Sequence, residues 1–297
     1  MQYGKIDLVT AIDYAKRNFE SNTGCGYVIP GRDTYWNYLS KESWSTFKAG
    51  MSRLHQAQYK DGDGGELDEK NSRYGLIPPK MASFGSSSRF LYLKSKNIPE
   101  FTFEKQFPTR VGHTANLDGY LEKGTNVYCV EAKCREIYRP HKNIKVNTVY
   151  EEVYNSIQDF NYDSQCIKDD LEHRKYTFKY KGKELSHFDI KQLICHFLGI
   201  TADILENRRN GISIHFIYLI FNPRTETLFT AEIEKYKDDI CKIYDKTIEE
   251  IQRFGDMKWL FDTIMEYQIK HLDLPRVEFS FDFECVDQNR YSSLFHK

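Results

Sequence analysis

The chain has 297 residues, 40% of them hydrophobic and 29% charged, and its formal net charge is −1. These values are typical of a soluble protein with one large core, or with one core and helical additions. A net charge so close to zero argues against a protein that coats nucleic acid without specificity, because such a protein needs an extended basic surface.

The sequence contains no segment with the roughly 18 consecutive apolar residues that a membrane span requires. Residues 1–20 also lack the charged and then apolar pattern of a signal peptide. The seven cysteines are scattered along the chain, which is typical of reduced structural thiols, so we expect a cytoplasmic protein. A zinc site would need a second close pair of ligands, which is missing beside the nearest candidates, Cys129, Cys134 and His141.

The first part of the chain, residues 1–98, is predicted to be a helical region packed on the core. Residues 6–19 and, less regularly, residues 45–59 place apolar side chains at helical spacing. A short helix capped by Ser87 or Ser88 is expected before the strands begin. Three acidic residues of this region are interpreted as solvated surface: Glu66, Asp68 and Glu69.

Strand patterns begin after Pro99. In residues 101–106, Phe101, Phe103 and Lys105 alternate with Thr102, Glu104 and Gln106. Residues 116–122 form a second strand candidate, and residues 127–133 form a third. Gly124 suits the positive φ of a hairpin turn between the second strand and the third. The second and third candidates are therefore predicted to form a hairpin.

Helices and strands then alternate along the chain. Residues 148–160 have helical spacing, and the charged stretch 168–183 is predicted to be a solvated insertion or hairpin. Residues 212–221 form an apolar run typical of a strand covered on both faces. Residues 231–270 are predicted to form charged surface helices, and residues 277–286 a late strand.

The clearest helical pattern covers residues 188–198, with Ser186 expected to cap the helix and Gly199 to end it. The order of elements predicts an α/β fold, in which a mixed β-sheet core is flanked by helices. We therefore expect a core over residues 99–230 and a helical C-terminal region over residues 231–297.

Two carboxylates and an ammonium group are predicted to meet on the central hairpin. Glu131 and Lys133 lie two residues apart on one strand, so their side chains point to the same side. The hairpin can bring Asp118 of the preceding strand beside them. Two adjacent carboxylates need a cation, and Mg²⁺ prefers such oxygen ligands, so phosphodiester hydrolysis is one interpretation. The alternative is a surface salt bridge between Glu131 and Lys133 on an edge strand.

The sequence resembles the PD-(D/E)xK nuclease superfamily, which has the restriction-endonuclease-like fold. Asp118 matches the first motif acid, and Glu131 with Lys133 matches the second motif. One departure is Leu117, which stands where many members have Pro. Three stretches carry the resemblance: 103–109, 115–121 and 127–133.

The resemblance implies a metal-dependent deoxyribonuclease that cuts DNA endonucleolytically, with Mg²⁺ or alternatively Mn²⁺. Asp118, Glu131 and the backbone carbonyl of Ala132 are expected to bind the metal, while Lys133 positions the attacking water. Many members have a Gln on the helix after the motif strand, which Gln192 matches. An acidic residue upstream often belongs to the site as well, and the candidate is Glu104.

Basic residues after the motif strand are candidates for contacts with the DNA backbone. This cluster consists of Arg135, Arg139, His141, Lys142 and Lys145, and a solvated loop that balances nearby acids is the alternative. On the 188–198 helix, His196 lies four residues after Gln192, so both face one groove. For His196 we favour simple polarity of the helix surface over a phosphate contact.

Other functions remain open at this point. A catalytically inactive DNA-binding protein of the same fold is disfavoured by the intact acidic and basic motif. A nucleotide phosphohydrolase is disfavoured because the chain has no phosphate-binding loop of the G-x-x-x-x-G-K-[ST] type. An RNA target is not separated from DNA by any residue. Restriction enzymes of this fold are often dimers, so the resemblance also allows a homodimer.

Overall fold

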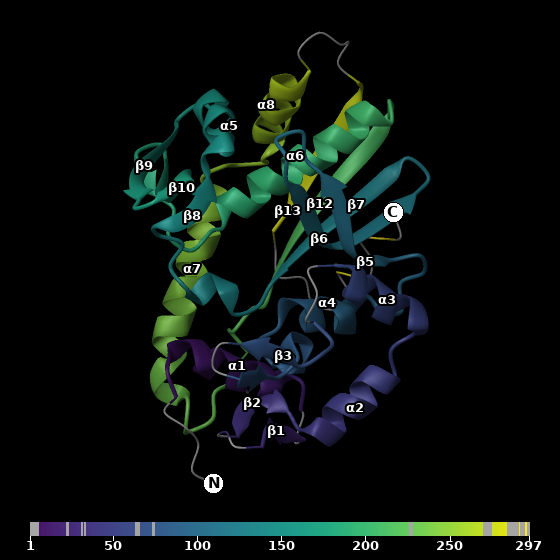
Figure 1. Cartoon of the computed structure of the whole chain (residues 1–297), viewed down its shortest axis with the longest axis vertical. Helices are drawn as coiled ribbons and strands as arrows, with labels where there is room; N and C mark the ends of the chain where they lie inside the picture. The colour runs from purple at the N-terminus through teal and green to yellow at the C-terminus, as the bar shows by residue number, and fades with distance from the viewer. Residues whose placement is uncertain are drawn as a thin grey trace.

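A mixed five-stranded sheet lies at the centre of the computed structural model, in the order β13-β12-β7-β6-β5 (Figure 1). β5 (Thr102–Pro108), β6 (Thr114–Lys123) and β7 (Asn126–Lys133) are antiparallel neighbours. β12 (Ile212–Ile220) is parallel to β7, and β13 (Val277–Asp282) is parallel to β12. The predicted mixed sheet with flanking helices is therefore confirmed.

The structure describes most of the chain. The described residues are 6–21, 24–30, 32, 34–62, 66–72, 75–225, 228–269, 275–283, 291 and 295. Within them, no helix is both long and apolar enough to span a membrane. The predicted late strand 277–286 is present as far as Asp282, and its residues 284–286 lie outside the described part.

Helix α6 (Ile190–Glu206) joins the insertion after β7 to the parallel strand β12 and packs against β5 and β6. The prediction that Gly199 ends this helix is wrong, because the helix continues for seven more residues. A Cβ atom at Gly199 would lie 2.8 Å from the Cβ atoms of both Ala115 and Phe107. Glycine is thus needed here for close packing of the helix on the sheet, and not for a turn.

The start of α6 also differs from the prediction. Asp189 caps the helix by accepting a hydrogen bond from the Gln192 N–H at 3.0 Å. Ser186, the predicted cap, donates instead to the buried carboxylate of Glu250 at 2.9 Å. A long-range partner therefore replaces the local capping contact.

The N-terminal region contains strands as well as helices. The helix predicted over 6–19 is confirmed as α1 (Leu8–Phe19). The pattern over 45–59 belongs to two helices separated by a break at 50–52. Its remaining elements follow in chain order: β1 (Cys25–Tyr27), β2 (Tyr35–Leu39), α2 (Lys41–Ala49), α3 (Arg53–Asp61), β3 (Lys70–Ser72), β4 (Gly75–Ile77) and α4 (Ser87–Ser95).

These N-terminal strands form two antiparallel pairs, β1 with β2 and β3 with β4. Three of the four have only three residues each, which is too short for an alternating pattern to be visible in the sequence. α4 begins after Ser86, whose side chain accepts a hydrogen bond from the Arg89 N–H at 3.2 Å, one or two residues before the predicted cap.

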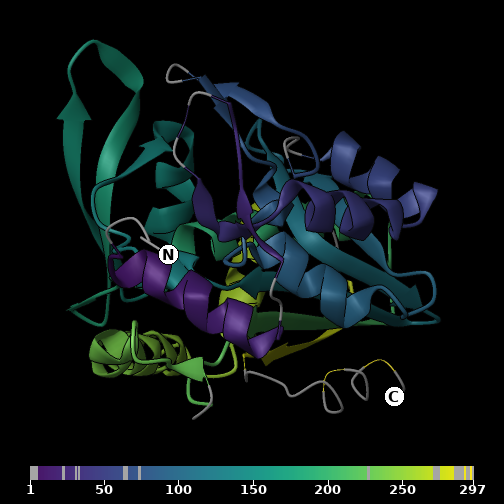
Figure 2. The same cartoon turned by 90° about the horizontal axis from the view of Figure 1, so that it is seen from below.

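An insertion between β7 and α6 forms a second sheet. The predicted helix 148–160 is shorter than expected and consists of a 3-10 turn and α5 (Glu151–Ser156). The predicted charged hairpin is confirmed and starts earlier, and Figure 2 shows it standing away from the body of the molecule. The sheet contains four strands: β8 (Ile144–Asn147), β9 (Phe160–Ile167), β10 (Asp170–Tyr180) and β11 (Lys183–Glu184).

The C-terminal region supplies α7 (Lys237–Gln252) and α8 (Lys258–Gln268), as predicted for residues 231–270. α8 packs against α6. α7 packs against α1 and against the 3-10 turn Glu136–Tyr138 that follows the motif strand (Figure 1). Both helices are therefore part of the framework around the core.

Candidate active site

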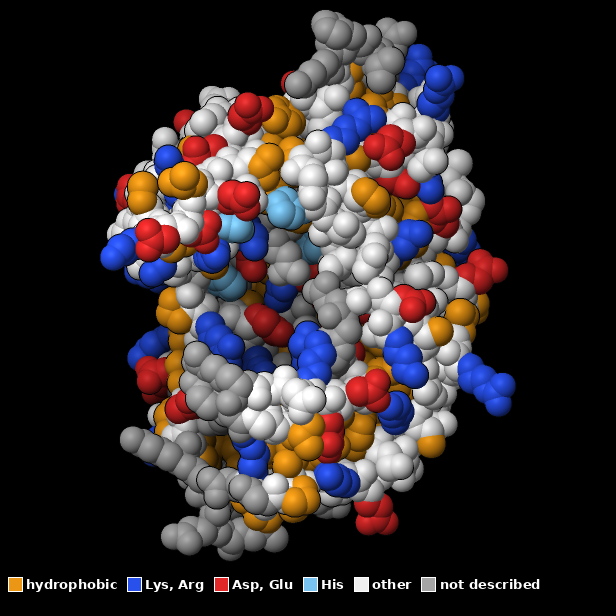
Figure 3. All heavy atoms as spheres, in the orientation of Figure 1, with side chains coloured by type: hydrophobic (Ala, Val, Ile, Leu, Met, Phe, Trp, Pro, Cys, Tyr) orange, Lys and Arg blue, Asp and Glu red, His pale blue; other side chains and the backbone are white. Residues whose placement is uncertain are grey.

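The predicted motif residues line one cleft of about 420 Å³. Figure 3 shows a hollow in this face of the molecule, with basic and histidine side chains gathered around it. The cleft has three sides. The N-terminal region provides Glu66, Lys80, Ser87 and Ser88; the sheet provides Glu104, Thr114, Asn116, Asp118, Glu131 and Lys133; and the start of α6 provides Asp189, Lys191, Gln192, Cys195 and His196.

The strands β6 and β7 separate where the motif begins. Their ladder runs from Lys123 and Asn126 to the pair Gly119 and Val130. Beyond that pair, the Asp118 side chain accepts a hydrogen bond from the backbone N–H of Ala132 at 2.7 Å. The Asp118 carboxylate thus takes the place of a backbone acceptor and lies against the motif strand. This contact holds it beside Glu131.

Lys133 is held by two oxygen acceptors. Its Nζ lies 2.5 Å from Oε1 of Glu131 and 2.6 Å from Oε1 of Gln192. The side chains of Glu131 and Lys133 are only 1% and 8% exposed, which rules out the alternative of a surface salt bridge. Gln192, which was predicted to lie on the helix after the motif strand, therefore contacts Lys133.

His196 completes the contacts of Glu131. Its Nε2 lies 2.9 Å from Oε2 of Glu131, and the residue is 2% exposed. The interpretation of His196 as surface polarity is wrong, because α6 turns this face toward the sheet. The spacing of four residues from Gln192 already placed both side chains on one face of the helix. Burial of that face was not visible in the sequence.

The two carboxylates differ in their electrostatic surroundings. Burial, followed by the neighbouring charge of Glu131, raises the pKa of Asp118 well above its ordinary value. Burial alone would raise the pKa of Glu131 too, but Lys133 and His196 outweigh it and lower that pKa to about 2. A second carboxylate beside an ionised one is an arrangement that a bound cation stabilises.

Glu104 lines the same cleft from β5. Its φ of 54° is in the left-handed region, which is uncommon for a residue other than glycine, above all within a strand. The end of α3 packs closely on this residue, since a Cβ atom at Gly62 would lie 2.8 Å from the Glu104 Cβ. The charge of Glu104 also contributes to the raised pKa of Asp118. The predicted upstream acid is therefore near the motif.

Glu66 is a residue of the cleft that sequence reasoning missed. It is 5% exposed, so its interpretation as solvated surface is wrong. Its Oε1 accepts a hydrogen bond from Lys80 Nζ at 2.9 Å, and its Oε2 is buried with no hydrogen-bond partner in the described part of the chain. Nothing in the local sequence distinguishes it from the exposed Asp68 nearby.

The predicted DNA contacts after the motif strand lie outside the cleft lining. Arg135 Nη1 is 3.1 Å from Oδ2 of the buried Asp13, and Lys142 Nζ is 2.6 Å from Glu184 Oε1. Arg139 is exposed. Besides Lys133, the lysines that line the cleft are Lys80 and Lys191, both missed by sequence reasoning.

The donor set fits a hard cation better than zinc. In the part of the chain that the structure describes, no three His, Cys, Asp or Glu side chains are grouped to hold a metal ion by themselves. Cys129 and Cys134, the nearest candidates for a zinc site in the sequence, are both buried. Mg²⁺ is commonly bound by one or two carboxylates with water and substrate phosphate, which Asp118 and Glu131 can provide.

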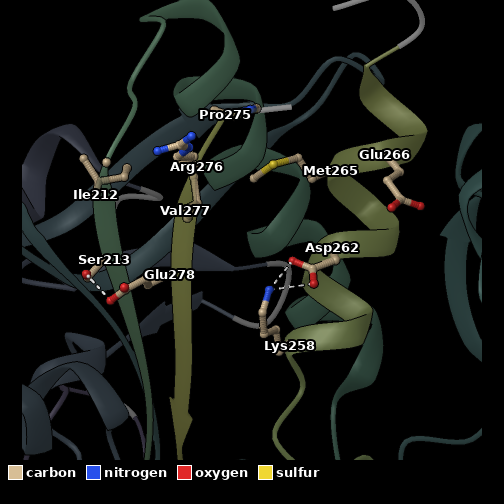
Figure 4. Close-up of a pocket in the computed structure, with 11 residues that line it drawn as sticks. Ile212, Ser213, Lys258, Asp262, Met265, Glu266, Pro275, Arg276, Val277 and Glu278 are labelled. Carbon is tan, nitrogen blue, oxygen red and sulfur yellow. Dashed lines mark hydrogen bonds and ion pairs between the residues drawn. The ribbon is translucent and has the colours of Figure 1, made fainter. Parts of the chain in front are cut away.

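A larger cavity of about 580 Å³ lies between β12, β13 and α8 (Figure 4). In it, Lys258 Nζ is 2.7 Å from Asp262 Oδ2, and the Ser213 hydroxyl donates to Glu278 Oε2 at 3.1 Å. None of the predicted motif residues lines this cavity. The candidate active site is therefore the smaller cleft, where the motif residues converge.

Comparisons with known proteins found no matching family model, no similar curated protein and no similar solved structure. A functional conclusion for this chain therefore depends on the chemistry and geometry of the cleft itself.

Proposed function

We propose that the chain is a metal-dependent deoxyribonuclease of the PD-(D/E)xK type, with a restriction-endonuclease-like core. The observation that carries the proposal is the group formed by the half-buried Asp118 and the buried Glu131 and Lys133 at the point where β6 and β7 separate. Gln192 supports it by reaching Lys133 from α6. An inactive DNA-binding relative would have no need to keep all of these contacts.

Asp118 and Glu131, with the carbonyl of Ala132, are the residues that would hold Mg²⁺ or Mn²⁺. A metal held there would supply Lewis-acid chemistry, which polarises a phosphate and lowers the pKa of a water molecule. Lys133 is placed to orient that water or to neutralise charge that develops on the phosphate. Its two acceptors keep its ammonium group in one position before substrate arrives.

The walls of the cleft suit a phosphate backbone. Lys80 contributes a cation from the N-terminal region, and Lys191 contributes one from the start of α6. Phosphate contacts of this kind bind a strand without reading its sequence. The preference for DNA over RNA comes from the family resemblance, so RNA belongs in the assay as a competing substrate.

The proposal is tested by cleavage of supercoiled plasmid, linear duplex and RNA in Mg²⁺ or Mn²⁺. Wild type is expected to cut DNA only with metal, and Asp118→Ala and Lys133→Ala are expected to be inactive while still folded by circular dichroism. Lys179→Ala, which removes an ion pair with Asp163 on the hairpin, is the control with wild-type activity.

An open-circular product from plasmid would demonstrate endonucleolytic action. If wild type leaves every substrate intact and calorimetry detects no metal binding, the proposed function is wrong. If RNA is cut and DNA is not, the reaction class stands and the substrate assignment is wrong.

A further inference from the structure

A fully buried carboxylate of the C-terminal region binds the segment that leads into α6. Glu250 of α7 is 0% exposed. Its Oε1 accepts hydrogen bonds from the N–H of Ser186 at 3.0 Å and from the Ser186 hydroxyl at 2.9 Å. Its Oε2 accepts from the N–H groups of His187 and Phe188, each at 2.8 Å. One side chain thus satisfies three consecutive backbone donors.

The same segment is also tied to the loop after the motif strand. The backbone N–H of His141 donates to the Ser186 carbonyl at 2.7 Å. The His187 ring Nδ1 lies 2.8 Å from the carbonyl oxygen of Ile137. Residues 186–188, which we call the α6 entry segment, therefore connect α7 on one side with the continuation of β7 on the other.

The α6 entry segment leads directly into the part of α6 that carries the functional side chains. Asp189 follows it directly as the helix cap, and Gln192 and His196 lie on the first two turns. Gln192 reaches Lys133 at 2.6 Å, and His196 lies 2.9 Å from Glu131. Because a helix moves as a rigid unit over such a short length, a shift of its start displaces both side chains from the motif.

We propose that Glu250 is a positioning residue of the active site, which acts through the α6 entry segment on Gln192 and His196. The inference rests on the proposed nuclease function. In this proposal, α7 helps to hold the side chains of the active site in place. A charged side chain at this buried place would cost stability without its full set of donors, and apolar packing would suffice if only attachment of a helix were needed.

The test compares Glu250→Gln with Glu249→Gln in the full-length protein, using plasmid cleavage in Mg²⁺. Glutamine keeps the shape but replaces one acceptor by an NH₂ group that faces backbone donors. We expect kcat to fall about 10- to 100-fold in Glu250→Gln, with KM for DNA changed by less than about twofold. Glu249 is 61% exposed on the same helix, so Glu249→Gln should keep wild-type kcat.

A double-variant cycle separates positioning from general weakening of the fold. If Glu250 acts through Gln192 and His196, the loss of kcat in the variant with both Glu250→Gln and Gln192→Ala is smaller than the product of the two single losses. Multiplicative losses, or a wild-type kcat in Glu250→Gln, would overturn the proposal. Hydrogen exchange should rise at the amides of residues 186–192 in Glu250→Gln and not in Glu249→Gln.

If Glu250→Gln does not fold, Ser186→Ala replaces it, because it removes only the hydroxyl donor to Glu250. Its kcat is expected to fall in the same direction by a smaller factor, and an unchanged kcat would contradict the inference. Failure of the proposed function is distinct, because wild type itself would then be inactive on every substrate. The exchange experiment would still report whether Glu250 holds the α6 entry segment.

Discussion

Lys133 and Arg135 lie two residues apart in the sequence but contact different parts of the protein. Lys133 ends β7 and faces the cleft, where it bonds to Glu131 and Gln192. Arg135 lies beyond the end of the strand and pairs with the buried Asp13 of α1. The alternation of side chains applies only within the strand, so it does not carry Arg135 to the same cleft.

Burial of Asp13 makes the stability of the folded protein depend on pH. Burial raises the pKa of Asp13 to about 6, although Arg135 and Asn37 oppose the shift. Because the folded pKa lies above the unfolded value, this carboxyl favours the folded state less as pH rises from 4 through 6. Relative to Asp13→Asn, wild type should lose about 3 kcal/mol of unfolding free energy over that range.

Urea denaturation at several pH values measures this difference. Asp163→Asn, which changes an exposed acid on the hairpin, is the control and should follow the wild-type curve. If the curves of wild type and Asp13→Asn stay parallel between pH 4 and 7, Asp13 ionises in the folded protein as it does in the unfolded chain.

At the scale of elements, α6 depends on its close approach to the sheet. Gly199 allows the helix backbone to lie against Phe107 of β5 and Ala115 of β6. The same helix carries Gln192 and His196 to the motif strand. The packing of α6 therefore contributes both to stability and to the geometry of the site.

Gly199→Val should displace α6 from β5 and β6. A Cβ atom at this position would already lie 2.8 Å from two neighbouring Cβ atoms, and overpacking of this kind costs about 1–3 kcal/mol of unfolding free energy. Cleavage should fall as well, because Gln192 moves with the helix. Chemical denaturation with a cleavage assay tests both, and a variant with wild-type stability would show that the helix tolerates the added volume.

At the scale of the whole molecule, the cleft is shared by regions far apart in the chain. Lys80 comes from the N-terminal region, Asp118 and Lys133 from the sheet, and Lys191 from α6. Glu250 adds support from the C-terminal region through the α6 entry segment. The flanking regions are therefore part of the same framework as the sheet.

DNA binding should depend on salt through the two cleft lysines. Lys80→Ala and Lys191→Ala should each reduce the slope of log K against log salt concentration by about 0.9 with duplex and about 0.7 with single strands. The slope is measured by fluorescence anisotropy, with each substitution combined with Lys133→Ala so that the DNA is not cleaved. Lys179→Ala on the hairpin is the matched control, and unchanged slopes for both cleft variants would place the DNA elsewhere.

Metal binding should stabilise the folded protein as a whole. Mg²⁺ at about a hundred times its Kd should raise the unfolding free energy by about 2.7 kcal/mol, because the unfolded chain has no assembled site. The rise should disappear in Asp118→Ala. Thermal denaturation with and without Mg²⁺ measures this, and an equal rise in both proteins would point to binding outside the motif.

The sequence by itself determined the parts of the protein that depend on neighbours along the chain. Alternation and a hairpin turn placed Asp118, Glu131 and Lys133 on adjacent strands, and helical spacing placed Gln192 and His196 on one face. The mixed sheet with flanking helices followed from the order of these elements. The placement of these side chains needs only the geometry of one strand, one turn or one helix.

Only the tertiary structure decided which of these surfaces are buried and which residues they contact. Glu66, Lys80 and Glu250 are joined to the site or its support by contacts between segments that are far apart in sequence. Arg135 lies beyond the end of β7 and pairs with Asp13. Gly199 lies within α6, where the helix packs closely on the sheet. Residue spacing carries no information about such contacts, since packing of complete elements against one another establishes them.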